Sequence, residues 1–184
     1  MGFLDAALKG LQRTIRTSRR EAGGRAPWGG RAPDKGDYGR AGAPWPDIDT
    51  LVTDAEIEAV TGASPAGEPR RNGDDGTDVD LGRLVIRESR LTNGDKFLIS
   101  LNNCVDTAAA DLAMDRMAEL EKPLDGVGER GLVRVKKSSK TGTSEVGVTA
   151  LERNFTLSLT HTSTTGMTDP RPLTELLKKA ISRL

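Results

Sequence analysis

Four groups of residues in this sequence have the types and spacings that chemistry at a protein site uses, and the first is a glycine-rich segment. Residues 126–131 read Gly-Val-Gly-Glu-Arg-Gly and match the pattern G-x-G-x-x-G. In dinucleotide-binding proteins this pattern follows a strand and opens a helix, and its glycines let the backbone approach a pyrophosphate. Here the segment follows a predicted helix and precedes a predicted strand. We therefore expect a tight connecting turn and no nucleotide site.

The second group consists of amide and acidic side chains that could bind a cation. Asn72, Asp74, Asp78 and Asp80 alternate through a loop that contains glycine, as oxygen ligands do in calcium loops. An EF-hand loop ends with a glutamate at its twelfth position that binds the ion through both carboxylate oxygens, and this loop lacks that glutamate. We expect a solvated loop, with weak cation binding as the alternative interpretation. The sequence therefore predicts no metal site and no cofactor.

His161 and Cys104 make up the last two groups, and each is the single residue of its type in the chain. Acyl transfer needs a base that is hydrogen-bonded to a nucleophile and oriented by a third group, and no Gly-x-Ser-x-Gly segment accompanies His161. Zinc needs about four ligands, more than these two residues supply. We expect Cys104 to be a buried, inert thiol, which fits a reducing compartment. The sequence predicts no catalytic residues and no enzyme activity.

An amphipathic basic helix is predicted at residues 1–21. Phe3, Leu4, Leu8, Leu11 and Ile15 follow the i, i+3, i+4 spacing that places apolar side chains on one stripe. Residues 1–40 hold nine Lys and Arg against four Asp and Glu, so this part of the chain is basic while the whole chain has a net charge of zero. Three interpretations stay open: the stripe binds a partner's groove, packs on the protein's own domain, or lies on a membrane surface.

A Gly/Pro/Arg-rich linker is predicted at residues 22–46, because glycine and proline disfavour helices and strands. It contains both tryptophans of the chain, Trp28 and Trp45, and the single tyrosine, Tyr38. Aromatic side chains with arginine beside them are typical anchors of protein interfaces, so Trp28 and Trp45 join the predicted partner-binding residues. The alternative is a linker that covers an apolar patch of its own domain. The modest basic charge argues against nucleic acid as the partner.

Residues 47–184 predict an α+β domain with an antiparallel sheet of about five strands and helices on one face. The predicted strands are 79–90, 96–102, 132–135, 145–151 and 155–162. The first helix of this domain begins after the capping-box residue Thr53 and ends at Gly62. A second helix spans about 106–121, with the stripe Ala109, Leu112, Ala113, Met117 and Leu120. A last helix follows Pro172, with the apolar stripe Leu173, Leu176, Leu177, Ala180, Ile181 and Leu184. Asn93-Gly94 predicts a two-residue type I′ turn between the first two strands.

Three stretches of this domain resemble a known family. They are Leu51–Gly62 (LVTDAEIEAVTG), Pro123–Gly131 (PLDGVGERG) and the ending from Phe155 through LTELL at 173–177 to Leu184. They resemble an actinobacterial small α+β domain of unknown function, as found in lipoproteins, which is similar to the extracellular sensor domains of some serine/threonine kinases. The resemblance covers about residues 50–184. It implies an antiparallel sheet backed by helices, a ligand- or partner-binding role and no catalytic residues.

These features favour a non-enzymatic interaction or adaptor protein, whose helix and linker dock the α+β domain onto a larger assembly. The alternatives are a peripheral membrane-surface protein and a small-ligand-binding, sensor-like domain. The apolar runs are far shorter than the roughly 18 residues that a spanning helix needs. The first residues include Asp5 and Lys9 and do not resemble a signal peptide. We therefore expect a soluble cytoplasmic protein, with the membrane periphery as the alternative location.

Overall fold

A computed structural model describes residues 46–72, 84–104, 107–164, 166 and 168–184. All of these residues belong to the unit Pro44–Leu184. The predicted helix at 1–21 lies outside the described residues, as does the predicted linker at 22–46 apart from Pro46. The described part of the chain is thus the predicted α+β domain.

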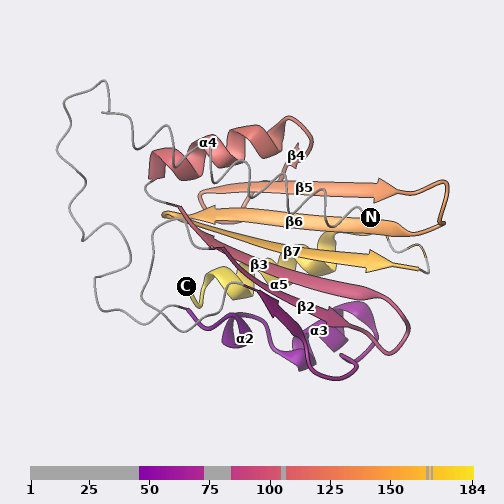
Figure 1. The fold of residues 1–184 in the computed structure, drawn as a ribbon. Coiled ribbons are helices and arrows are strands. Elements are labelled where there is room, and N and C mark those ends of the chain that lie inside the picture. Colours follow the sequence, from indigo (N-terminus) through magenta and orange to yellow (C-terminus); the bar gives the residue numbers. More distant parts are fainter. Residues whose placement is uncertain (1–45, 73–83, 105–106, 165, 167) are drawn as a thin grey trace, which may run out of the picture. The chain divides into compact units, whose positions relative to one another are not determined.

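The described residues form an antiparallel sheet and four helices, which confirms the predicted α+β class (Figure 1). The sheet has seven strands in the order β1-β2-β3-β7-β6-β5-β4. The strands are β1 (Arg70–Asn72), β2 (Leu84–Arg90), β3 (Lys96–Asn103), β4 (Lys122–Pro123), β5 (Arg130–Lys137), β6 (Ser144–Glu152) and β7 (Phe155–Ser163). The helices are α2 (Ile48–Leu51), α3 (Asp54–Thr61), α4 (Thr107–Ala118) and α5 (Arg171–Ile181). Five strands match the predicted ones, and the short edge strands β1 and β4 are additional.

Helices pack on both faces of the sheet, so the prediction of helices on one face was wrong. We call the side with α2, α3 and α5 the first face, and α5 contacts β6 and β7 there. Its core includes side chains that are fully buried: Ile57, Phe97, Ile99, Leu101, Val146, Val148, Leu157, Leu159, Leu173 and Leu177. The second face carries α4, where Ala110 and Met114 pack with Leu132, Leu151 and Cys104. Alternation along β5 and β6 turns Leu132 and Leu151 away from the first face, which gives α4 its own small core.

The turn between β2 and β3 differs from the predicted type I′ turn and shifts the strand register by one residue. The amide of Gly94 donates to the carbonyl of Leu91 at 2.9 Å, and the amide of Leu91 donates to the carbonyl of Asp95 at 2.9 Å. Gly94 has a φ of +86°, whereas Asn93 does not have a positive φ. This is a three-residue loop, a type I turn followed by a left-handed glycine.

The shifted register decides which side chains reach the core. A two-residue turn at Asn93-Gly94 would pair Ile86 with Leu101, whereas the structure pairs Ile86 with Ser100 and Val85 with Leu101. Ile86 therefore lies on the second face, and Arg87 comes to the first face, where 4% of its side chain is exposed. A one-residue slip exchanges the faces of a strand, and the loop length is its cause here.

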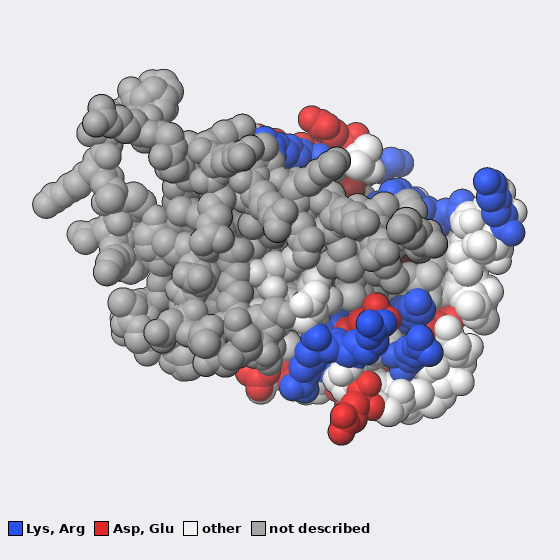
Figure 2. Space-filling view, in the orientation of Figure 1, with Lys and Arg blue, Asp and Glu red and all other residues white. Residues whose placement is uncertain are grey.

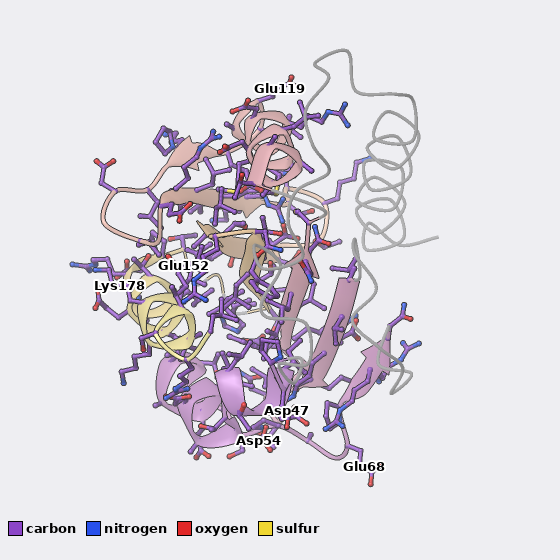
Figure 3. The ribbon with its side chains drawn as sticks, turned by 90° about the vertical axis from the view of Figure 1, so that its left-hand side faces the viewer. Asp47, Asp54, Glu68, Glu119, Glu152 and Lys178 are labelled. Carbon is purple, nitrogen blue, oxygen red and sulfur yellow. The ribbon has the colours of Figure 1, made fainter. Side chains whose placement is uncertain are left out.

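Arg87 joins the sheet to the helices that precede it. Its guanidinium donates to the carbonyl of Val52 at 2.9 Å and forms ion pairs with Asp49 and Asp54. Asp54, labelled in Figure 3, is the first residue of α3. A buried arginine needs such partners because a charge without them is costly inside a protein.

Helix α4 buries only part of the predicted stripe: Ala109 and Met117 pack against the small core, but the buried side is rotated from the predicted one. Ala110 and Met114 are fully buried, whereas Leu112 and Leu120 of the predicted stripe are 38% and 75% exposed. Alanines at 108–110 and 113 make several sides of the helix apolar, so the pattern does not define one stripe. Ala110 and Met114 pack with Leu132 and Leu151, and this contact sets the rotation of the helix.

Two other predicted helices are confirmed. Thr53 and Glu56 form the predicted capping box at the start of α3, and Gly62 ends that helix in the left-handed conformation. In α5, the predicted apolar stripe is buried, with Leu173, Leu176, Leu177 and Ala180 at most 3% exposed. These local signals need no tertiary information because the groups involved lie within one or two helical turns.

Candidate functional site

The glycine-rich segment at 126–131 forms the predicted tight turn, between β4 and β5. Gly126 and Gly128 have φ angles of +72° and +60°. A side-chain carbon on Gly128 would lie 2.4 Å from the carbonyl oxygen of Leu151, and one on Gly131 would lie 2.3 Å from that of Leu124. The segment opens a strand rather than a helix, so it lacks the helix N-terminus that holds a pyrophosphate. Gly128 and Gly131 serve the close packing of backbone, whereas Gly126 serves the left-handed turn.

His161 forms a buried pair with a residue that the sequence did not single out. Its Nε2 lies 3.1 Å from Oδ2 of Asp95, and each side chain is 1% exposed. Oδ1 of Asp95 accepts hydrogen bonds from the backbone amide and the hydroxyl of Thr164, at 2.7 and 2.8 Å. The pair joins the β2–β3 turn to the end of β7. Because both side chains are closed off from solvent, the pair is placed for a structural role rather than for contact with a substrate.

The pKa values of this pair are both lowered, for different reasons. Burial is the largest influence on His161 and lowers its pKa, although Asp95 acts in the opposite direction. For Asp95, burial raises the pKa, but the hydrogen bonds from Thr164 and Ser163 and the nearby His161 outweigh it. Oδ1 and Oδ2 of Asp95 thus both have partners, and a neutral imidazole beside a carboxylate is the favoured state of the pair.

Cys104 is buried, as predicted, and lies in a small amide network. The Nδ2 of Asn102 donates to its Sγ at 3.3 Å, and its backbone amide donates to the carbonyl of Asn154 at 2.8 Å. Asn154 also donates to Oδ1 of Asn103 at 2.6 Å. The network connects the end of β3 to the β6–β7 turn. Within the described ranges, no group of three or more His, Cys, Asp or Glu side chains could hold a metal ion.

The predicted partner-binding residues lie outside the described residues. They are Phe3, Leu4, Leu8, Leu11, Ile15, Trp28 and Trp45. The same is true of Asp74, Asp78 and Asp80 in the candidate cation loop, of which Asn72 alone is described, at the end of β1. The binding role of residues 1–46, which we call the basic arm, therefore stays a prediction. In the part of the chain that is described, no helix is long and apolar enough to cross a membrane.

A charged cluster on the second face was not foreseen. Arg134 of β5 bonds to Oε1 of Glu121 at 2.9 Å and forms an ion pair with Glu145 of β6 at 2.8 Å. Burial raises the pKa of the Glu121 carboxyl, and the attraction of Arg134 only partly offsets this effect. The three side chains come from separate parts of the chain, so their meeting depends on the pairing of β5 with β6 and on the path from α4 into β4.

The same corner of the domain contains an incompletely covered strand edge. Strand β4 has two residues and pairs with Leu132 and Val133, so Arg134 to Lys137 continue β5 beyond it. Val135 is 46% exposed. Figure 2 shows Lys and Arg side chains gathered at the turn that follows this segment, between β5 and β6. Residues 134–137 therefore form an edge that no described strand covers.

The sequence matches no protein-family model, and it matches no curated protein.

Proposed function

We propose that this protein is a non-enzymatic interaction protein, in which residues 1–46 dock the α+β domain onto a larger assembly. One observation carries the proposal: the apolar stripe from Phe3 to Ile15 and both tryptophans precede a domain that has its own core. Residues 47–184 contain only two aromatic residues, Phe97 and Phe155, and both are buried. Large aromatic and aliphatic anchors outside a core are the usual means of binding a protein partner.

The chemistry-capable residues of the domain support this proposal because their contacts are structural. Gly128 and Gly131 make room for backbone, His161 is paired inside the domain, and Cys104 is 6% exposed. A residue that acts on a substrate must be able to touch it. A reducing, cytoplasmic location fits the single cysteine.

A peripheral membrane protein is the second candidate, favoured by the basic residues beside the stripe. Residues 1–21 contain Lys9, Arg13, Arg16, Arg19 and Arg20, and such residues are attracted to anionic lipid. The family resemblance favours a third role, a sensor-like domain that binds a small ligand. The partner-docking proposal and the membrane candidate differ in what the stripe contacts, so one variant distinguishes them.

The decisive variant changes both Leu8 and Leu11 to Glu in the full chain. Burial of a leucine contributes roughly 1.5–3 kcal/mol, so two glutamates on the stripe should abolish docking on a protein surface. The matched control, Arg13→Gln with Thr17→Glu, changes the net charge by the same amount off the stripe and should retain the complex. We expect the Leu8/Leu11 variant to stay folded and to leave its complex in a co-purification from native extract.

Two further measurements distinguish the other roles of the stripe. Binding of the wild-type chain to vesicles with anionic lipid, reversed by salt and lost in the Leu8/Leu11 variant, would favour the membrane candidate. A fall in the melting temperature by several degrees would show that the stripe packs on its own domain. Retention of the complex with an unchanged melting temperature would contradict the proposal.

A further inference from the structure

The outer edge of β5 is open over half of the strand. Strand β5 runs from Arg130 to Lys137 and pairs with β6 along its full length. On the other side, β4 pairs only with Leu132 and Val133, and Pro123 at its end has no amide to donate. In the described part of the chain, no strand pairs with the outer side of residues 134–137. Alternate residues there turn their N–H and C=O groups away from β6, as the edge of an antiparallel sheet does.

Exposed apolar side chains flank this open edge. The described residues contain three exposed large hydrophobic side chains, Leu112, Leu120 and Val135. Val135 lies within the open segment, on the same face as α5 because it pairs with Val146 of the core. Leu120 is two residues before Lys122, which pairs with Val133, so the chain keeps it within about 7 Å of β4. Two of the three side chains thus lie at the place where backbone groups are also available.

The charges at this edge are mainly positive, and they select the kind of strand that could pair with it. Lys137 and Lys140 follow Val135, and both are exposed. Arg134 is held by Glu121 and Glu145. A second copy of this chain would place lysine and arginine opposite lysine in either nearby antiparallel register, and like charges directly opposite destabilise a strand pair. An acidic strand would have the opposite effect.

We propose that the outer edge of β5, from Arg134 to Lys137, receives an extended acidic segment of a partner protein as an added strand. Main-chain hydrogen bonds would supply affinity, and Val135 and Leu120 would supply an apolar contact. Lys137 and Lys140 would supply the preference for acidic residues. The inference rests on the proposed role as an interaction protein and names the chemistry of one partner. It concerns a different surface from residues 1–46.

The test uses the full chain and short labelled peptides of alternating Val and Glu, measured by fluorescence anisotropy. A Val/Lys peptide tests the charge preference, and a Val/Glu peptide with Pro at every second Val tests the need for main-chain hydrogen bonds. Of the three peptides, we expect only the Val/Glu peptide without proline to bind. Changing Lys137 and Lys140 to Glu should weaken it about tenfold or more, because charges at the rim of an interface steer and hold the partner.

The matched control changes Lys178 and Lys179 to Glu on α5, which alters the net charge equally. Lys178 lies on the side of α5 away from the sheet (Figure 3), and both lysines are exposed. This variant should bind the Val/Glu peptide as the wild type does. Amide hydrogen exchange supplies the location: the bound peptide should slow exchange within residues 134–137.

Several results would overturn the inference. The Val/Glu peptide could fail to bind the chain, or the proline peptide could bind as tightly as the Val/Glu peptide. The Lys178/Lys179 control could weaken binding as much as the Lys137/Lys140 variant does. The bound peptide could also slow amide exchange elsewhere without slowing it at residues 134–137. A self-association of the chain that the Lys137/Lys140 variant abolishes would assign the edge to a second copy instead. The Leu8/Leu11 variant keeps the edge intact, so it should still bind the peptide. If only the peptide test fails, the proposal for residues 1–46 is unaffected. If only the test of the Leu8/Leu11 variant fails, the proposal for the edge of β5 is unaffected.

Discussion

At Gly128 and Gly131 the chain has no room for a side chain, so an added carbon should destabilise the domain. Gly131→Ala would place a carbon 2.3 Å from the carbonyl oxygen of Leu124 without any positive φ to explain the cost. We expect it to destabilise the domain by about 1–3 kcal/mol, the usual cost of overpacking. Gly128→Ala combines a clash of 2.4 Å with a φ of +60° and should cost at least as much.

Gly126→Ala is the matched control, because its φ is +72° but nothing lies near the added carbon. It should cost about 1 kcal/mol, the usual penalty of a left-handed alanine. Urea denaturation of the three variants checks the order. A cost at Gly128 and Gly131 no larger than that at Gly126 would contradict the role of packing against the carbonyl groups.

The buried His161–Asp95 pair predicts that the domain loses stability in mild acid. The folded state lowers the pKa of His161 below its ordinary 6.5, so the unfolded state binds the proton more tightly. Stability should therefore fall as the pH drops below about 6.5. The lowered pKa of Asp95 adds a second loss below its ordinary 3.8, because the carboxylate form favours folding.

The measurement is the urea midpoint at a series of pH values that spans both ordinary pKa values, 6.5 and 3.8. His161→Gln removes the titrating imidazole while it keeps a side chain that can donate to Asp95. This variant should be less stable at neutral pH but should lose less on going to mild acid. A wild-type domain whose stability is the same well below the ordinary histidine pKa of 6.5 as above it would contradict the prediction.

At the scale of the elements, one carboxylate connects the first helices to the end of the chain. Arg183, just after α5, donates to both oxygens of Glu56 at 2.8 and 2.7 Å, and to the carbonyl of Leu51 at 2.7 Å. Glu56 also accepts from the amide of Thr53 in the capping box at 3.1 Å. The hydrogen bonds from Arg183 lower the pKa of Glu56 to about 2, against an opposing effect of burial.

Glu56→Gln should destabilise the domain by about 1–2 kcal/mol, because it weakens both the cap and a bidentate ion pair. The wild-type contribution is present above the ordinary pKa of 4.5 and is lost as the pH falls toward 2. The cost of the variant should therefore shrink in acid. Glu58→Gln, an exposed position on the same helix, should cost little. Thermal unfolding of both variants tests this, and an equal effect would show that the Arg183 contact does not stabilise the domain.

At the scale of the whole molecule, the domain should be stable without its basic arm. The two described cores are built from side chains of residues 48–184. A chain of residues 47–184 should unfold cooperatively in urea, with a free energy of unfolding close to that of the full protein. A loss of several kcal/mol, a large part of the usual stability of a domain, would show that residues 1–46 contribute to a core.

Local signals of the sequence determined the α+β class, the capping box at Thr53, the buried stripe of α5 and the turn at 126–131. Each depends on residues a few positions apart, whose hydrogen bonds and periodicity act within one element. The exposed Asn93-Gly94 pair marked a turn for the same reason. It could not set the loop length, because a type I turn with a left-handed glycine and a type I′ turn accept the same residues.

Tertiary structure decided what depends on elements far apart in the chain. The register of β2 against β3, shifted by one residue from the predicted one, places Val85 in the core and Arg87 next to Asp49 and Asp54. The alanine-rich α4 was oriented by its contact with Leu132 and Leu151 on the second face. The Asp95–His161 pair and the open edge of β5 arise in the same way. Their physical reason is that burial and strand pairing act on the assembled sheet, whereas periodicity describes each element alone.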